Sequence, residues 1–230
     1  MLKKRLRKVL SSSQEQGWVM EPESKQILKD IGISVPKFRV VTEWEEALGA
    51  AGDIGYPLVC KVVSSSIIHK SDKGGVIVGV DSQKKLKSAF QKLKQLDGFK
   101  SMLVEETVDG LELIVGAKND YQFGPVILLG IGGIGVEIYQ DTSIRMAPIS
   151  DSDVDCMISD LKAHQLIEGF RGQAPVNREK LVRMMIGISE LSMELGEQFE
   201  SIDLNPVMCT DNYCIAADAR IILKSSDSDI

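Results

Sequence analysis

One of the chain's two histidines lies in a polar segment, Ser64-Ser-Ser-Ile-Ile-His-Lys-Ser-Asp-Lys-Gly-Gly-Val76. A neutral imidazole can accept a phosphoryl group and pass it on as a covalent intermediate. Lys70 and Lys73 stand near His69 and could offset the charge of that group. The alternative is a surface histidine without a role. His164 lies in a helical segment without such neighbours and is interpreted as structural.

A lysine stands at the centre of the apolar segment Pro57-Leu-Val-Cys-Lys-Val-Val63, which predicts a β-strand because it is rich in β-branched residues. Side chains alternate between the two faces of a strand, so the lysine should point away from Leu58, Cys60 and Val62. A buried lysine is costly without an anionic partner. Lys61 aimed into a cleft would suit a phosphate, whereas an exposed sheet face is the alternative.

Oxygen-bearing side chains near the C-terminus could bind a divalent cation. In the strand-like segment Ser201-Ile-Asp-Leu-Asn-Pro-Val207, Asp203 and Asn205 should face the same side. An antiparallel neighbouring strand could bring Asp218 alongside them. Mg²⁺ accepts such a small set of protein oxygens when substrate phosphates complete the shell. Turns at Asn-Pro and at Asp218 are the alternative interpretation.

Two further segments could contact a nucleotide. Glu105 and Glu106 end one predicted strand and Glu112 lies in the next, so a hinge between them could hydrogen-bond a purine edge and leave a carboxylate for ribose. Solvated acids at strand ends are the alternative. The cluster Gly130-Ile-Gly-Gly-Ile-Gly135 lacks the Rossmann and Walker spacings. These glycines could make a tight turn or let the backbone approach a ligand.

The elements that must position these residues are strands and helices without strict alternation, which favours an α+β fold with antiparallel sheets. Thr42 is expected to open a helix, with Glu45 completing a capping box. Helices are predicted over residues 21–31, 83–96, 152–163 and 178–195, and strands over 35–41, 57–63, 75–80, 101–106, 111–118, 125–130, 200–208 and 213–219, with a strand pair within 136–147. The expected domains are a basic helical extension (1–20), two subdomains (21–100 and 101–224) and a loose tail (225–230).

The composition narrows the functional class. The 230 residues are 43% hydrophobic and 26% charged, with a net charge of −6, which is typical of a globular protein. The basic start could suggest RNA binding, but the net charge favours a short solvated helix and no nucleic-acid partner. No apolar run approaches the roughly 18 residues of a membrane span. The four cysteines form no CxxC pattern, which indicates reduced thiols in a cytoplasmic protein.

Taken together, these stretches resemble the ATP-grasp fold, and within it the beta subunits of ADP-forming acetyl-CoA synthetases (acetate–CoA ligases). More distantly they resemble succinyl-CoA synthetase beta subunits. The likeness runs from about Glu21 to Ile222 and rests on the combined order of its motifs. These are Gly55-Tyr-Pro-Leu-Val-Cys-Lys61, Ile68-His-Lys-Ser-Asp72 with Gly74-Gly75-Val76, Phe123-Gly-Pro125, Gly130-Ile-Gly-Gly133, Arg145-Met-Ala-Pro148 and Asp203-Leu-Asn-Pro206.

The resemblance implies two α+β subdomains that enclose ATP or ADP with Mg²⁺ between antiparallel sheets. It assigns phosphate contact to Lys61, adenine and ribose to the hinge from Glu105 to Val108, and phosphoryl transfer to His69. The remaining implied residues are Glu112, Gly132, Gly133 and Arg145 for the nucleotide, and Asn205 and Asp218, with Asp203 beside them, for Mg²⁺.

The implied reaction is acyl-CoA + ADP + phosphate ⇌ carboxylic acid + ATP + CoA. Because the chain has no CoA-binding Rossmann fingerprint, the implied partner is a CoA-binding alpha subunit with a second phosphohistidine, in a heterotetramer of two alpha and two beta chains. Two alternatives remain. One is another ATP-grasp carboxylate ligase that works through an acyl phosphate, and the other is a nucleotide-sensing module without turnover.

Overall fold

The computed structural model describes residues 2–67, 70–133 and 141–224. Its contacts divide the chain into two units, Pro36–Val108 and a second unit formed by Met1–Val35 with Asp109–Ile230. The expected boundary near residue 100 instead falls within a strand of the first unit. Residues 21–35 belong to the second unit, because the Ala216 amide donates to the Ser34 carbonyl at 2.9 Å.

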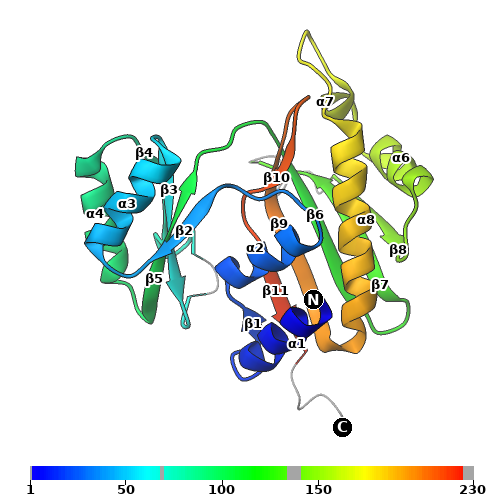
Figure 1. Ribbon diagram of the computed structural model, residues 1–230. Helices are drawn as coiled ribbons and strands as arrows, with labels where there is room; N and C mark the ends of the chain where they lie inside the picture. Colours follow the sequence, from blue (N-terminus) through cyan, green and yellow to red (C-terminus); the bar gives the residue numbers. More distant parts are fainter. Residues whose placement is uncertain (1, 68–69, 134–140, 225–230) are drawn as a thin grey trace. The chain divides into compact units, whose positions relative to one another are not determined.

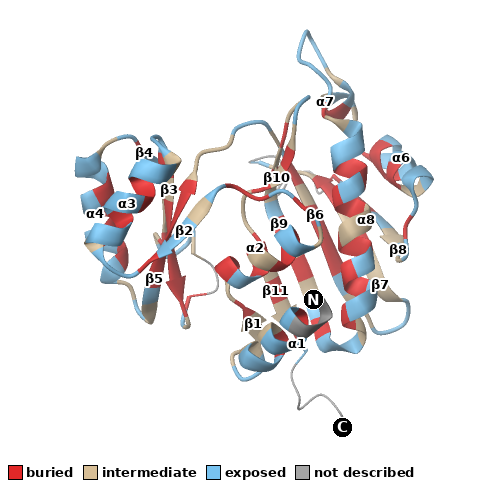
Figure 2. Cartoon of the chain, viewed as in Figure 1, coloured by how far each residue is buried: buried red, intermediate tan, exposed pale blue. Residues whose placement is uncertain are grey.

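The first unit is a four-stranded antiparallel sheet with strand order β2-β5-β3-β4 and two helices. Leu58, Cys60 and Val62 pack into its core with Leu86 and Leu93 of a helix, as the predicted alternation requires. Most of β3 is buried (Figure 2). The elements are β2 (Phe38–Val41), α3 (Trp44–Ile54), β3 (Leu58–Ser64), β4 (Val76–Val80), α4 (Gln83–Lys94) and β5 (Phe99–Glu106).

The helix α3 begins one residue later than its sequence predicted. Glu43 is the N-cap and shares a capping box with Glu46. Both the amide and the hydroxyl of Thr42 donate to the Glu46 carboxylate, at 2.7 and 3.1 Å. Glu46, and not the expected Glu45, is therefore the acid of the capping box, and it holds Thr42 outside the helix.

The second unit is a seven-stranded antiparallel sheet in the order β1-β11-β9-β6-β7-β8, with β10 also paired to β9. Every strand pair in the described residues of both sheets is antiparallel, which confirms the predicted α+β class. The elements are α1 (Leu2–Ser13), β1 (Trp18–Val19), α2 (Glu21–Asp30), β6 (Leu111–Asp120), β7 (Gly124–Ile131), β8 (Thr142–Met146), α6 (Asp151–Asp160), α7 (Gln165–Glu168), α8 (Arg178–Leu195), the 3₁₀ turn η1 (Gly196–Gln198), β9 (Phe199–Cys209), β10 (Cys214–Ala216) and β11 (Arg220–Leu223).

The long helix α8 crosses β6, β7 and β9 (Figure 1). It begins where the Asn177 side chain accepts from the Lys180 amide at 3.0 Å. Leu113, Leu129 and Leu204 are fully buried on the strands beneath it. We call the face on which these three leucines lie the helix-covered face of the sheet. The residues that alternate with such residues along each strand lie on the opposite face.

Of the last predicted strand, over residues 213–219, only Cys214–Ala216 (β10) is a strand, and the further strand β11 follows at Arg220–Leu223. Residues 217–219 leave the ladder between β10 and β11 and form a bend. Within the described residues, no helix is long and apolar enough to cross a membrane.

Candidate functional site

Lys61 on β3 forms a buried ion pair with Glu105 on β5. Their side chains are 7% and 2% exposed, and Nζ lies 3.1 Å from the carboxylate. In the ladder Val59 lies opposite Glu105, so the lysine meets the acid diagonally across one face. The buried Lys61 thus has the anionic partner that it was expected to need. This partner, Glu105, is a residue of the predicted hinge.

The same carboxylate affects its neighbour Cys60. Burial raises the pKa of the Cys60 thiol to about 12, and the negative charge of Glu105 adds to the shift. The thiol therefore stays protonated at neutral pH. Since the thiolate is the nucleophilic form, Cys60 serves the core and not catalysis.

The hinge between β5 and β6 is attached to the first unit by its own side chains. The Glu106 carboxylate accepts from the Lys37 amide at 2.8 Å, and the Thr107 hydroxyl donates to the Pro57 carbonyl at 3.0 Å. Val108 is half-buried and is the last residue of the first unit. The predicted nucleotide hinge thus coincides with the boundary between the units.

In the second unit, Glu112 lies against the glycine turn that follows β7. The Gly132 amide donates to the Glu112 carbonyl at 2.7 Å. A Cβ on Gly132 would come within 2.8 Å of the Glu112 backbone, so no other residue fits without movement. Gly133 adopts a φ of 82°, which favours glycine. The structure therefore brings together Glu112, Gly132 and Gly133, while Ile134 and Gly135 of the cluster lie outside the described residues.

The structure also brings Asn205 and Asp218 to opposite positions. Ala216 pairs with Val207 and Arg220 pairs with Asp203, so the same register holds on both sides of the bend. Continued through the bend, this register would place Asp218 opposite Asn205, where the ladder is interrupted. Relative to β6, β9 carries an extra residue between Leu204 and Val207. Bulges of this kind re-aim side chains beside functional sites.

The oxygen donors of Asn205 and Asp218 fit Mg²⁺. Asn205 is exposed and Asp218 is half-buried. Groups of three or more His, Cys, Asp or Glu that could enclose a metal are absent from the part of the chain that the structure describes. A pair of oxygens with the rest of the shell supplied by phosphates and water is the arrangement that Mg²⁺ accepts.

Asp203, expected beside the metal ligands, is engaged elsewhere. Its carboxylate accepts from the Arg220 guanidinium at 2.9 Å, between two residues directly opposite in the ladder. Asp203 thus pairs with Arg220 two positions from Asn205 and links β9 to β11 beside the bend, and a metal-ligand role for Asp203 stays a prediction.

Arg145 on β8 lies on the other side of the sheet from Glu112. It pairs with Ile127, which lies on the helix-covered face with Ala117. Its guanidinium contacts Asp160 of α6 at 2.6 Å and holds the pKa of that carboxyl below its usual range. The structure therefore does not bring Arg145 together with the other candidate residues.

His69 lies outside the described residues, but the segments that flank it are well defined. Ile67 is part of the first unit's core cluster. The Gly75 amide donates to the Lys70 carbonyl at 2.7 Å, and the Val62 amide donates to the Gly75 carbonyl at 2.8 Å. A Cβ on Gly75 would lie 2.7 Å from Val62. Ile67 is thus attached to the core of the first unit, and Gly75 is attached to its sheet at Val62.

One pair near the metal ligands was missed from the sequence. Lys25 and Glu21 of α2 form a buried ion pair at 2.9 Å, and Lys25 also donates to the Ala217 carbonyl at 2.8 Å. Glu and Lys four residues apart usually form a solvated helix pair. The available signal was the helical stripe, since Leu28 continues the same face and is fully buried.

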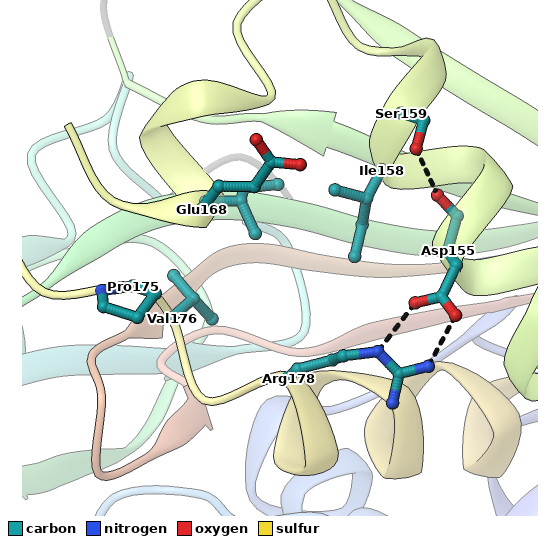
Figure 3. A pocket seen from close by; sticks show the side chains of 8 residues that line it. Asp155, Ile158, Ser159, Glu168, Pro175, Val176 and Arg178 are labelled. Atoms are coloured by element: carbon teal, nitrogen blue, oxygen red, sulfur yellow. Dashed lines mark hydrogen bonds and ion pairs between the residues drawn. The ribbon is translucent and has the colours of Figure 1, made fainter.

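A concave pocket of about 430 Å³ lies elsewhere in the second unit (Figure 3). At its rim the Arg178 guanidinium faces the Asp155 carboxylate, with two contacts of 2.7 Å. None of the candidate nucleotide or metal residues lines it. Its walls are Asp155, Ile158, Ser159, Ile167, Glu168, Pro175, Val176 and Arg178.

Comparisons with known proteins identify the family of the chain. A profile described as the ATP-grasp domain matches residues 10–223. The beta subunit of ADP-forming acetate–CoA ligase I from Pyrococcus furiosus is 42% identical over 213 residues, which cover 89% of this chain and 91% of the relative. The chain belongs to this ATP-grasp family. The family's members are ligases, so the predicted enzyme class is confirmed.

Solved structures of the family have the same fold. Acetyl-coenzyme A synthetase 1 of Ca. Korarchaeum cryptofilum, with coenzyme A, Ca-AMPCP and HgCl⁺, aligns with a TM-score of 0.89 at 36% identity, over 95% of this chain and 99% of that chain. A second structure of that protein contains coenzyme A and Mg-AMPPCP, with its phosphohistidine segment pointing towards the nucleotide-binding site. It aligns with a TM-score of 0.83 at 36% identity and the same coverage. The ATP-grasp fold is confirmed, and ATP or ADP with Mg²⁺ agrees with the ligands of these relatives.

Proposed function

We propose that the chain is the ATP- and ADP-binding beta subunit of a cytoplasmic ADP-forming acyl-CoA synthetase. The reaction is acyl-CoA + ADP + phosphate ⇌ carboxylic acid + ATP + CoA. The observation that carries the proposal is the match to an acetate–CoA ligase beta subunit along nearly the whole length of both chains.

The geometry of the second unit supports a metal site in this proposal. Asn205 and Asp218 would hold Mg²⁺ on the phosphates, because their oxygens come from opposite positions of one interrupted ladder. Gly132 and Gly133 would present backbone amides to the nucleotide beside Glu112, where a side chain has no room. Mg²⁺ would neutralise charge on the transferring phosphoryl group.

The first unit would contribute a fixed positive charge and the hinge. Lys61 would contact the phosphates as a point charge, and its pairing with Glu105 restricts where the ammonium can lie. Backbone groups near Val108 would contact the adenine and ribose. Arg145 has no part in this set, because it is bound to Asp160 on the helix-covered face.

His69 would accept a phosphoryl group from a phosphohistidine of the partner and transfer it to the terminal phosphate of ADP, which forms ATP. The phosphohistidine segment of the Korarchaeum protein supports this role. The partner would be a CoA-binding alpha subunit, in an assembly of two alpha and two beta chains. The beta-subunit designation of the Pyrococcus relative supports a partner.

The test combines the chain with its partner, acyl-CoA and radiolabelled phosphate, separates the two subunits on a gel, and then adds ADP. We expect label on both subunits and its release as ATP. His69→Ala should keep label on the partner and abolish ATP formation, while His164→Ala should remain active. An acyl-phosphate ligase would form product without label on this chain, and a sensor would bind ATP without transfer. Normal ATP formation by His69→Ala would disprove the shuttle.

A further inference from the structure

The buried pair of Lys25 and Glu21 has no part in the site as described above. Their side chains are 0% and 1% exposed. Each buried ion costs several kcal/mol of solvation, on the order of the attraction it regains, and replacing such a pair by apolar residues is often neutral or stabilising. The stability of the fold therefore does not by itself explain a lysine at this position of α2.

The lysine acts on the backbone of the bend. Its ammonium donates to the Ala217 carbonyl at 2.8 Å, and the Ala217 amide donates to the Pro206 carbonyl at 3.0 Å. The peptide groups on both sides of Ala217 are thus fixed, one by α2 and one by β9. α2 contacts β11, which follows this bend (Figure 1).

Asp218 is the next residue. The peptide group that Lys25 holds is the one that joins Ala217 to Asp218, so its plane sets the direction in which the Asp218 side chain leaves the backbone. The Asp218 carboxylate also accepts from the Ala219 amide at 2.8 Å, which restricts its rotation. Lys25 therefore acts on the orientation of the carboxylate through the peptide group that precedes it.

We propose that Lys25, held by Glu21, is a positioning residue for the Mg²⁺ ligand Asp218 and thereby sets the affinity for Mg²⁺-nucleotide. This inference rests on the proposed function, in which Asp218 and Asn205 bind the metal. Residues that orient metal ligands typically contribute about 10- to 100-fold to metal affinity.

The test is calorimetric titration of the full chain with Mg²⁺-ADP, and with ADP in a chelator. Lys25→Met should weaken Mg²⁺-ADP binding by about 10-fold or more and leave binding of metal-free ADP unchanged. If the single variant does not fold, the double variant Glu21→Gln/Lys25→Met removes both charges of the pair and should show the same loss. Unchanged Mg²⁺-ADP binding by the variant that folds, or an equal loss of metal-free ADP binding, would overturn the proposal.

Leu28→Ala is the matched control, because Leu28 is a fully buried residue of the same helix. It should lower the melting temperature and preserve Mg²⁺-ADP affinity. If it weakens Mg²⁺-ADP as much as Lys25→Met, packing of α2 explains the effect and the proposal fails. Asp218→Asn separates the two proposals. If Asp218→Asn binds Mg²⁺-ADP as wild type does, the proposed metal site is wrong. If Asp218→Asn weakens Mg²⁺-ADP binding but Lys25→Met does not, only the positioning role of Lys25 is wrong.

Discussion

Each unit of the molecule contains a buried lysine paired with a glutamate, and the two pairs are built differently. Lys61 and Glu105 meet across neighbouring strands of the first unit. Lys25 and Glu21 lie one turn apart on a helix of the second unit, and the ammonium also binds a carbonyl in a bend. The same chemical pair can thus fix a charge for a ligand in one place and fix a backbone in another.

Removal of one partner from the strand pair should have the largest effect. Lys61→Met leaves Glu105 buried without its counter-charge, which should lower the free energy of unfolding by about 3–5 kcal/mol. The double variant Lys61→Met/Glu105→Gln should recover most of that stability but still lose about 1.5–3 kcal/mol of nucleotide-binding free energy. Urea unfolding and calorimetry measure the two quantities. Wild-type nucleotide affinity in the double variant would make the pair purely structural.

Removal of the proposed metal ligands should have the next largest effect. Asn205→Ala and Asp218→Asn each delete an oxygen that the phosphates cannot replace. We expect Mg²⁺-ADP affinity to fall by more than about tenfold for each variant, with melting temperatures near that of wild type. Calorimetry with and without Mg²⁺ distinguishes metal loss from nucleotide loss, and equal affinities in all three proteins would contradict the assignment.

Gly132 provides a smaller test of the second unit, with a glycine of the first unit as its control. Gly132→Ala places a Cβ against the Glu112 backbone and should cost about 1–3 kcal/mol of stability, together with weaker nucleotide binding. Gly52→Ala is the matched control, because Gly52 lies in α3 with no atom within 4 Å of the added Cβ. That change should stabilise the protein by up to about 1 kcal/mol. Equal melting temperatures for the two variants would contradict the close approach at Gly132.

The smallest effect is expected at Arg145. Because its guanidinium is bound to Asp160 on the helix-covered face, Arg145→Ala should keep Mg²⁺-ADP affinity within about twofold of wild type, as for partly exposed ion pairs. Calorimetry again provides the measurement. A large loss of affinity would return Arg145 to the nucleotide site.

The sequence predicted much of the fold because its apolar periodicity is strong. The helix over 178–195 has the predicted bounds, and the alternation around Lys61 placed Cys60 in the core. The start of the helix α3 was predicted one residue too early. Thr42 was expected to be its N-cap, but Glu43 and Glu46 form the capping box instead.

The candidate site was harder to predict, because it depends on register. Alternation along a strand tells which residues share a face with Arg145. Only the pairing with Ile127 shows that this is the helix-covered face of the sheet. The bend at residues 217–219 corresponds to the alternative of a turn at Asp218, which the sequence alone did not distinguish from a continuous strand. Lys25 was missed because burial of a helical Lys–Glu pair depends here on a bend almost two hundred residues away, at Ala217.

The order in which the chain is synthesised matters for the pairing of β1 with β11. Trp18 pairs with Ile222 and Val19 with Ile221, so β1 cannot pair until β11 has been synthesised. The unit Pro36–Val108 is one continuous segment and has all its strands once residue 108 has left the ribosome. Because contacts between distant segments form slowly, we expect this inserted unit to fold during translation. The segment that contains β1 then remains a target for chaperones and proteases until β11 has left the ribosome.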